Sequence, residues 1–192
     1  MFEKLDLLVD GGGMAMIFLS ALGYSVGEGN IDEESVNIAK SILELAKENN
    51  TEVILPTDVV VSESFGVDSN YKTISLTELK DKGFVMDIGP ETLKLFISKL
   101  NNCRTIVWNG PMGVFEFEQF SNGTRGLAEA VANIKNVTSI VGGGSTAEAI
   151  NKLGLVNAVT HISTGGGASL EFLEGKDLIG VSKIPEIDVV DL

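Results

Sequence analysis

The sequence predicts an α/β fold: a Rossmann-like parallel sheet with helices on both faces, in three α/β/α layers. Three observations predict it. Short apolar runs alternate with helix-like stretches, three of the junctions between them carry Gly-Gly-Gly, and 192 residues suit one domain. The triplets occupy residues 11–13, 142–144 and 165–167. Strand–helix alternation builds parallel β-α-β units with right-handed crossovers, so we expect one domain over residues 1–192, with an irregular tail over 176–192.

The apolar runs predict strands because buried parallel strands carry apolar residues in unbroken runs. The run at residues 5–9 ends at the first triplet, and the next strand, 53–56, ends at a proline. Residues 59–75 are rich in β-branched and turn residues and predict strands joined by a loop. The remaining predicted strands are 83–88, 105–108, 139–141 and 159–162.

Residues typical of helix starts and stops flank the stretches between these runs. The helix predicted over 14–22 stops at Gly23, and Asn30 or Asp32 caps the next helix, whose apolar residues form one broad face. Pro90 at a first helical position opens a helix that ends near residue 100. The remaining predicted helices are 124–134, 146–153 and 168–173.

The composition argues against several classes of protein. A formal net charge of −13, with Arg104 and Arg125 the only arginines, argues against nucleic-acid binding, which needs clustered positive charge. The one cysteine, Cys103, cannot form an internal disulfide and fits a reducing compartment. No apolar stretch reaches membrane-spanning length, and residues 1–4 lack signal-peptide character. We therefore expect a cytoplasmic protein with no membrane and no nucleic-acid partner.

The glycine-rich turns indicate a site for a phosphate-bearing ligand. Each triplet ends a predicted strand and opens a predicted helix, and so does a fourth turn at residues 108–113. Glycine lets the backbone approach a ligand closely, and a helix N-terminus directs free N–H groups and partial positive charge at an anion. Because parallel strands end at one edge of a sheet, these turns predict a nucleotide site at the carboxyl edge.

Two common phosphate-binding motifs fit these glycines poorly. The P-loop needs a lysine after its glycines, and no lysine follows any glycine cluster here. The small residues of the dinucleotide-binding fingerprint are matched by Gly142, Gly144 and Ala147. However, residues 164–168, where the ribose-binding acid belongs, are small and neutral, so a dehydrogenase is disfavoured.

Longer strings resemble one family. VWNGPMGVFE at residues 107–116 resembles the nucleotide-binding turn of phosphoglycerate kinase, and HISTGGGASLE at 161–171 resembles that family's closing glycine motif. GGGMA at 11–15, DIGP at 87–90 and GGG at 142–144 fall in the family's order, so the resemblance covers nearly the whole chain. It implies the C-terminal, nucleotide-binding half of phosphoglycerate kinase, which moves a phosphoryl group between 1,3-bisphosphoglycerate and Mg-ADP in glycolysis.

The resemblance implies a role for each matching residue. The adenine and ribose would lie against Gly12, Gly13, Met86, Gly110, Pro111, Val114, Phe115 and Glu116. Glu116 would accept hydrogen bonds from the ribose hydroxyls, because a carboxylate offers only acceptors. The phosphates of ADP or ATP would lie against Gly143, Gly144, Ser145 and Thr146, with Ser145 also a ligand of Mg²⁺. Gly166 and Gly167 would be catalytic, stabilising charge on the transferring phosphoryl group from a helix N-terminus.

Two features depart from the family pattern. The family's second half opens with a strand carrying Gly-Gly-Ala-Lys-Val and a lysine-bearing helix, and this sequence starts after both, so we expect the sheet to lack its first strand and the site to lack those lysines. Ser145 stands where the family has a metal-binding aspartate, and a neutral oxygen holds Mg²⁺ more weakly. Because the phosphoglycerate-binding N-terminal half is also missing from the sequence, we expect weak nucleotide binding and no catalysis by these residues alone.

Three hypotheses stay open from the sequence. In the first, the chain is the nucleotide-binding half of phosphoglycerate kinase and acts with the missing N-terminal half. In the second, it is a non-catalytic nucleotide-binding module. In the third, it self-associates as a homo-oligomer through the incomplete sheet.

Overall fold

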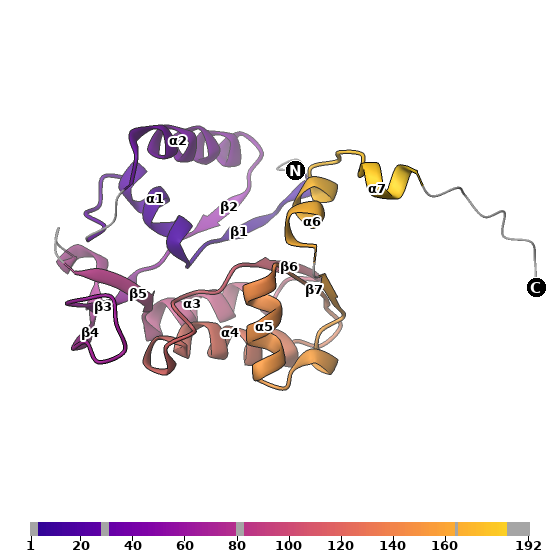
Figure 1. Cartoon of the computed structure of the whole chain (residues 1–192). Coiled ribbons are helices and arrows are strands. Elements are labelled where there is room, and N and C mark those ends of the chain that lie inside the picture. Colours follow the sequence, from indigo (N-terminus) through magenta and orange to yellow (C-terminus); the bar gives the residue numbers. More distant parts are fainter. Residues whose placement is uncertain (1–3, 28–30, 80–82, 164, 184–192) are drawn as a thin grey trace, which may run out of the picture.

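The computed structural model describes residues 4–27, 31–79, 83–163 and 165–183, and Figure 1 shows the arrangement of their helices and strands. The strands are β1 (Leu7–Val9), β2 (Glu52–Ile54), β3 (Asp58–Ser62), β4 (Tyr71–Ser75), β5 (Phe84–Ile88), β6 (Thr105–Asn109), β7 (Thr138–Gly142) and β8 (His161–Ser163). The helices are α1 (Gly13–Ala21), α2 (Glu33–Glu48), α3 (Pro90–Leu100), α4 (Asn122–Asn133), α5 (Gly144–Lys152), α6 (Gly166–Leu173) and α7 (Ile179–Ser182). The predicted α/β class is confirmed.

Two parallel ladders carry the glycine-rich turns. β1 pairs with β2, and β7 lies between β6 and β8. In the second ladder Asn109 pairs with Gly142, and Gly142 pairs with Ser163, so the three strands end level with one another. In Figure 1, α3, α4 and α5 lie on one side of the β6-β7-β8 sheet and α6 lies on the other.

A third sheet differs from the purely parallel prediction. β3 lies between β4 and β5 and is antiparallel to both, with a register shift between Val60 and Val61. The segment between β3 and β4 is short, and strands joined by a short loop pair antiparallel because a parallel crossover needs a dozen or more residues. The strands predicted within residues 59–75 therefore form a hairpin rather than part of the parallel sheet.

The predicted helices appear with small shifts at their ends. α3 has the predicted bounds and begins at Pro90. Asp32 caps α2 by accepting the Ser35 N–H at 2.7 Å, while Asn30, the other predicted cap, lies outside the described residues. α1 ends before Gly23, whose φ of 87° suits a glycine after a helix. The tail predicted as irregular contains α7, and residues 184–192 lie outside the described part.

Two helix N-termini, those of α3 and α4, are held by carboxylates that come from distant strands. Gly89, the residue before α3, has no capping side chain, and Asp58 of β3 instead accepts the N–H groups of Thr92 at 2.7 Å and Glu91 at 3.2 Å. Asp87 of β5 accepts the Gly123 N–H at the start of α4, at 2.8 Å. These bonds satisfy backbone donors that a helix start otherwise leaves unpaired.

Apolar side chains from both parallel ladders share one core. Ile106 and Trp108 of β6 are buried against Leu127 and Val131 of α4 and Phe96 of α3. Three partly buried residues of the first ladder pack against the same cluster: Leu7, Val9 and Ile54. Within the described ranges, no helix is long and apolar enough to cross a membrane.

Candidate functional site

Each of the four glycine-rich turns contacts the next one along the edge formed by the carboxyl ends of the parallel strands. A Cβ on Gly12 would lie 2.8 Å from the Pro111 carbonyl oxygen, so the first turn touches the turn after β6. The Gly110 N–H donates to Thr146 Oγ1 at 2.7 Å, which joins that turn to α5. A Cβ on Gly166 would lie 3.0 Å from the Gly143 Cα. The strand tips that the sequence predicted to gather do gather.

Within each triplet the second and third glycines have different surroundings. The second ones, Gly12, Gly143 and Gly166, lie so close to neighbouring backbone or side-chain atoms that a Cβ would be crowded. The third ones, Gly13, Gly144 and Gly167, have no heavy atom within 4 Å of such a Cβ and are exposed. The second glycines therefore serve contact between turns, and the third ones leave open space at the start of α1, α5 and α6.

Two turns also need glycine for its backbone conformation. Gly143 has φ 85° and ψ 144°, and a Cβ there would lie 2.5 Å from Asn109 Oδ1. Gly110 has φ 99°. Side chains rarely adopt positive φ, so both positions are strained for any other residue. Asn109 was not among the predicted site residues, although it directly precedes Gly110 in the motif.

The turn after β6 is held by hydrogen bonds from its surroundings. Trp108 Nε1–H donates to the Gly110 carbonyl at 2.7 Å, the Met112 N–H donates to Thr124 Oγ1 at 3.0 Å, and the Val114 N–H donates to the Met86 carbonyl at 2.8 Å. Trp108 is buried, as a core residue would be. A turn held at three points presents its exposed backbone in one conformation.

The predicted contacts of the base are not all exposed. The Met86 side chain is 1% exposed and lies in the core, so it reaches the edge only through its backbone. Pro111 and Val114 are half-buried, so a base could contact them, and the Pro111 carbonyl lies next to Gly12 of the first turn. Thr146 is fully buried, and its hydroxyl is engaged by Gly110. It therefore positions that turn and does not reach a ligand in this conformation.

Positive potential at this edge comes from helix ends. α1 and α5 have nine residues each and α6 has eight, and each begins within or directly beside its triplet. The four turns contain no Lys or Arg. Ser145, exposed in the first turn of α5, offers one neutral oxygen. The described part of the chain contains no cluster of three or more His, Cys, Asp or Glu that could hold a metal ion.

One carboxyl at the edge was missed by the sequence prediction. Asp10 directly follows β1, and burial raises its pKa to about 6, against smaller lowering by the N–H groups of Gly12 and Gly11. Its Oδ2 is buried with no hydrogen-bond partner in the described part of the structure. The signal was present in the sequence as the one charged residue between an apolar run and a triplet.

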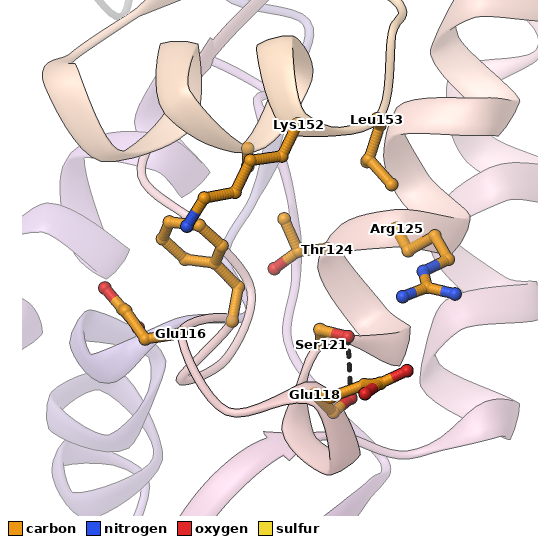
Figure 2. A pocket seen from close by; sticks show the side chains of 9 residues that line it. Glu116, Glu118, Ser121, Thr124, Arg125, Lys152 and Leu153 are labelled. Carbon is orange, nitrogen blue, oxygen red and sulfur yellow. Dashed lines mark hydrogen bonds between the residues drawn. The ribbon is translucent and has the colours of Figure 1, made fainter.

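A pocket of about 240 Å³ lies between the segment that carries Glu116 and Glu118, the start of α4 and the end of α5 (Figure 2). It is lined by Phe115, Glu116, Glu118, Ser121, Thr124, Arg125, Ala149, Lys152 and Leu153. Lys152 Nζ lies 5.3 Å from the centre of the Phe115 ring and 2.7 Å from Glu148. Only Phe115 and Glu116 belong both to this pocket and to the predicted site. Phe115 is buried, and Glu116 is exposed.

Comparisons with known proteins agree on one family. A family model described as phosphoglycerate kinase matches residues 1–176. The chain is 46% identical over 183 residues to the cytosolic phosphoglycerate kinase of Nicotiana tabacum. The aligned region covers 94% of this chain and 46% of the tobacco protein. It is 48% identical over 187 residues to the phosphoglycerate kinase of Thermosipho africanus, covering 96% and 46%. The chain thus spans about half the length of the curated relatives it matches.

Solved structures of the same family share the fold. The chain superposes on the phosphoglycerate kinase of Coxiella burnetii with a TM-score of 0.86 and 42% identity, covering 91% of this chain and 45% of that one. For the phosphoglycerate kinase of Pyrococcus horikoshii the TM-score is 0.75 and the identity 34%, covering 90% and 43%.

Proposed function

The chain belongs to the phosphoglycerate kinase family, and we propose that it supplies the nucleotide-binding half of such an enzyme. The complete enzyme would transfer a phosphoryl group between 1,3-bisphosphoglycerate and Mg-ADP. The observation that supports this proposal is the contact of all four glycine-rich turns along one edge, with the third glycine of every triplet exposed and uncrowded.

The arrangement suits a nucleotide because the base, the ribose and the phosphates each need a different kind of protein surface. The apolar side chains of Pro111 and Val114 would pack against the base, and the exposed Glu116 would accept hydrogen bonds from the ribose. The first turns of α5 and α6 would direct N–H groups at the phosphates. In this role Gly144 and Gly167 are the closest approach points, while Gly143 and Gly166 hold the turns together.

Magnesium would enter as part of the nucleotide substrate. Mg²⁺ is usually held by one or two protein oxygens together with phosphates and water. Ser145 supplies one such oxygen, and the positive end of α5 does not favour a cation without a phosphate beside it. The proposed role of Ser145 is therefore a weak additional ligand to a phosphate-bound ion.

The strength of binding follows from these groups. Burying about 150 Å² of a base contributes roughly 4 kcal/mol, and two helix N-termini contribute on the order of 1–2 kcal/mol together. A sum of about 5–6 kcal/mol corresponds to a dissociation constant of about 0.1 mM. Without a lysine in the turns, we expect Mg-ADP to bind in this weak range.

Isothermal calorimetry with Mg-ADP tests the proposal. Gly144→Ala should weaken binding at least tenfold, because the new methyl group occupies the space that the phosphates need, while the fold tolerates it. Gly180→Ala is the matched control, since a Cβ there also meets no atom within 4 Å but α7 is no part of the site. Equal affinities of the two variants, or no binding at several millimolar Mg-ADP, would contradict the proposed site.

Activity requires a second assay. We expect phosphoryl transfer only when the part of a relative that this chain does not match is also present. The absence of Lys and Arg from the four turns favours one rival, a nucleotide-binding module without catalysis. Mg-ADP binding without any transfer in the combined assay would support that rival.

A further inference from the structure

Two charged side chains of the pocket between α4 and α5 have no partner. Arg125 is one of two arginines in the chain, and among the described residues its guanidinium makes no hydrogen bond and no ion pair. The carboxylate of Glu118, which lines the same pocket, also has no partner in that part of the chain. The pocket measures about 240 Å³. Sites for drug-sized ligands measure roughly 300–1,000 Å³, so this pocket suits a smaller molecule.

The two unpartnered charges lie at one end of the pocket. Figure 2 shows the guanidinium of Arg125 and the side chain of Glu118 on the same side, and Lys152 and Glu116 on the opposite side. The backbone explains this placement. The Ser121 N–H donates to the Glu118 carbonyl at 3.2 Å, and the Arg125 N–H donates to the Ser121 carbonyl at 2.9 Å. Residues on successive helical turns share a face, so a ligand at this end meets a cation and an anion together.

The rest of the lining is largely apolar. Phe115 and Ala149 are buried, and Leu153 is half-buried. Lys152 Nζ lies 5.3 Å from the centre of the Phe115 ring and 2.7 Å from Glu148, so its charge already has two partners. A small ligand bound at Arg125 would therefore place the remainder of its surface against apolar side chains.

We propose that this pocket is a second ligand site, which binds a free α-amino acid with an aliphatic side chain. Arg125 holds the carboxylate through two parallel N–H···O bonds, and Glu118 accepts hydrogen bonds from the ammonium group. An α-amino acid carries both charges on one carbon atom, which matches the two opposite charges at one end of the pocket. The aliphatic side chain then lies against Phe115 and Leu153. The site does not rest on the proposed nucleotide site, because it leaves Glu116 to the ribose.

Other classes of small ligand suit the pocket less well. A metal ion lacks ligands, because the part of the chain that the structure describes has no cluster of three or more His, Cys, Asp or Glu. An inorganic dianion would pair with Arg125 but would lie beside the carboxylate of Glu118, which repels it. An uncharged apolar molecule would remove water from both charges without replacing its hydrogen bonds. A zwitterion with an apolar side chain satisfies both charges and covers the apolar lining.

NMR titration of the full chain with L-leucine tests the site. The backbone amide signals of Ser121, Arg125 and Ala149 should shift with one common dissociation constant. We expect a value of about 0.1–10 mM, as for a ligand of about nine non-hydrogen atoms at a solvent-exposed site. The amides of Ile38 and Leu45 on α2, which do not line the pocket, are the internal controls and should not shift.

Variants and a leucine analogue test the two charged contacts separately. Arg125→Gln should weaken leucine binding at least tenfold, because it removes the paired donors of the carboxylate. Arg104→Gln is the matched control, since Arg104 is the other arginine, is exposed and does not line the pocket. Urea unfolding of both variants shows whether either change acts through stability instead.

The analogue 4-methylpentanoate is leucine without its amino group. Wild type should bind it at least tenfold more weakly than leucine, because Glu118 then has no ammonium group to pair with. In Glu118→Gln this preference for leucine should disappear. Glu118 is exposed, so the substitution should leave the fold intact.

Each remaining outcome overturns the amino-acid site. No shift of the pocket amides at about 50 mM leucine means that the pocket does not bind it. Equal affinity of wild type for leucine and 4-methylpentanoate means a simple anion site. Tighter binding of L-glutamate than of L-leucine means that the apolar lining does not select the side chain. Equal losses in Arg125→Gln and Arg104→Gln, or displacement of leucine by Mg-ADP, also refute a separate site at Arg125.

Discussion

Replacing Gly143 by alanine should destabilise the protein by about 2–4 kcal/mol. The backbone there has φ 85° and ψ 144°, a conformation that costs a non-glycine residue about 1–3 kcal/mol. The added Cβ would also lie 2.5 Å from Asn109 Oδ1 and 3.8 Å from Thr146 Oγ1. Relieving the closer contact costs about 1–3 kcal/mol in shifted side chains. The lower entropy of alanine in the unfolded chain offsets up to about 1 kcal/mol of the total.

The assay is urea unfolding followed by circular dichroism, with Gly144→Ala as the matched control. Gly144 is the first residue of α5, and a Cβ there meets no atom within 4 Å, so alanine should leave the stability equal or slightly higher. For a slope of about 2 kcal/mol per molar urea, the Gly143→Ala midpoint should fall by about 1–2 M. Equal midpoints for the two variants would refute the argument that the second glycine of a triplet is required by its neighbours.

Two further predictions concern groups that hold the site. Thr146→Val should lower the free energy of unfolding by about 1–3 kcal/mol, because the Gly110 N–H loses its acceptor. Thr146→Ser keeps this hydrogen bond and should lose less stability. Equal losses of stability in the two variants would contradict the role of the hydroxyl. Burial raises the pKa of Asp87 from its ordinary 3.8 to about 7, so the folded state holds this proton more tightly than the unfolded state does. Between about pH 4 and pH 7 wild type should therefore lose stability relative to Asp87→Asn, by on the order of 4 kcal/mol in all, with no further change above about pH 7. A pH-independent difference between the two unfolding curves would show that Asp87 does not titrate in this range.

The local elements could be read from the sequence because neighbouring residues determine them. Pro90 at a first helical position placed the start of α3 correctly, since its ring already has a helical φ and its missing N–H is not needed there. The glycine triplets marked the ends of β1, β7 and β8 for a similar local reason. The predicted functional roles of the site residues stay predictions.

Neighbouring residues in the sequence could not predict the antiparallel sheet or the burial of the Met86 side chain. β3 and β5 pair across more than twenty residues, and the same β-branched pattern suits either strand direction. The Met86 side chain is buried by residues brought from other elements, although its motif position indicated a ligand contact. Both depend on which apolar faces pack together, and a strand's own residues do not specify that.

The sequence alone determined that the three glycine triplets would end strands and open helices, because glycine itself allows the tight turn that this needs, whereas the turn at residues 108–113 ends β6 but α4 begins only at Asn122. Tertiary structure decided which glycine in each triplet touches a neighbouring turn and which one stays open. Gly143 contacts Asn109 and Gly166, and Gly12 contacts Pro111, across separations of 23 to 99 residues. Such contacts arise from packing of whole strands and helices, so only the folded chain distinguishes glycines that look identical in the sequence.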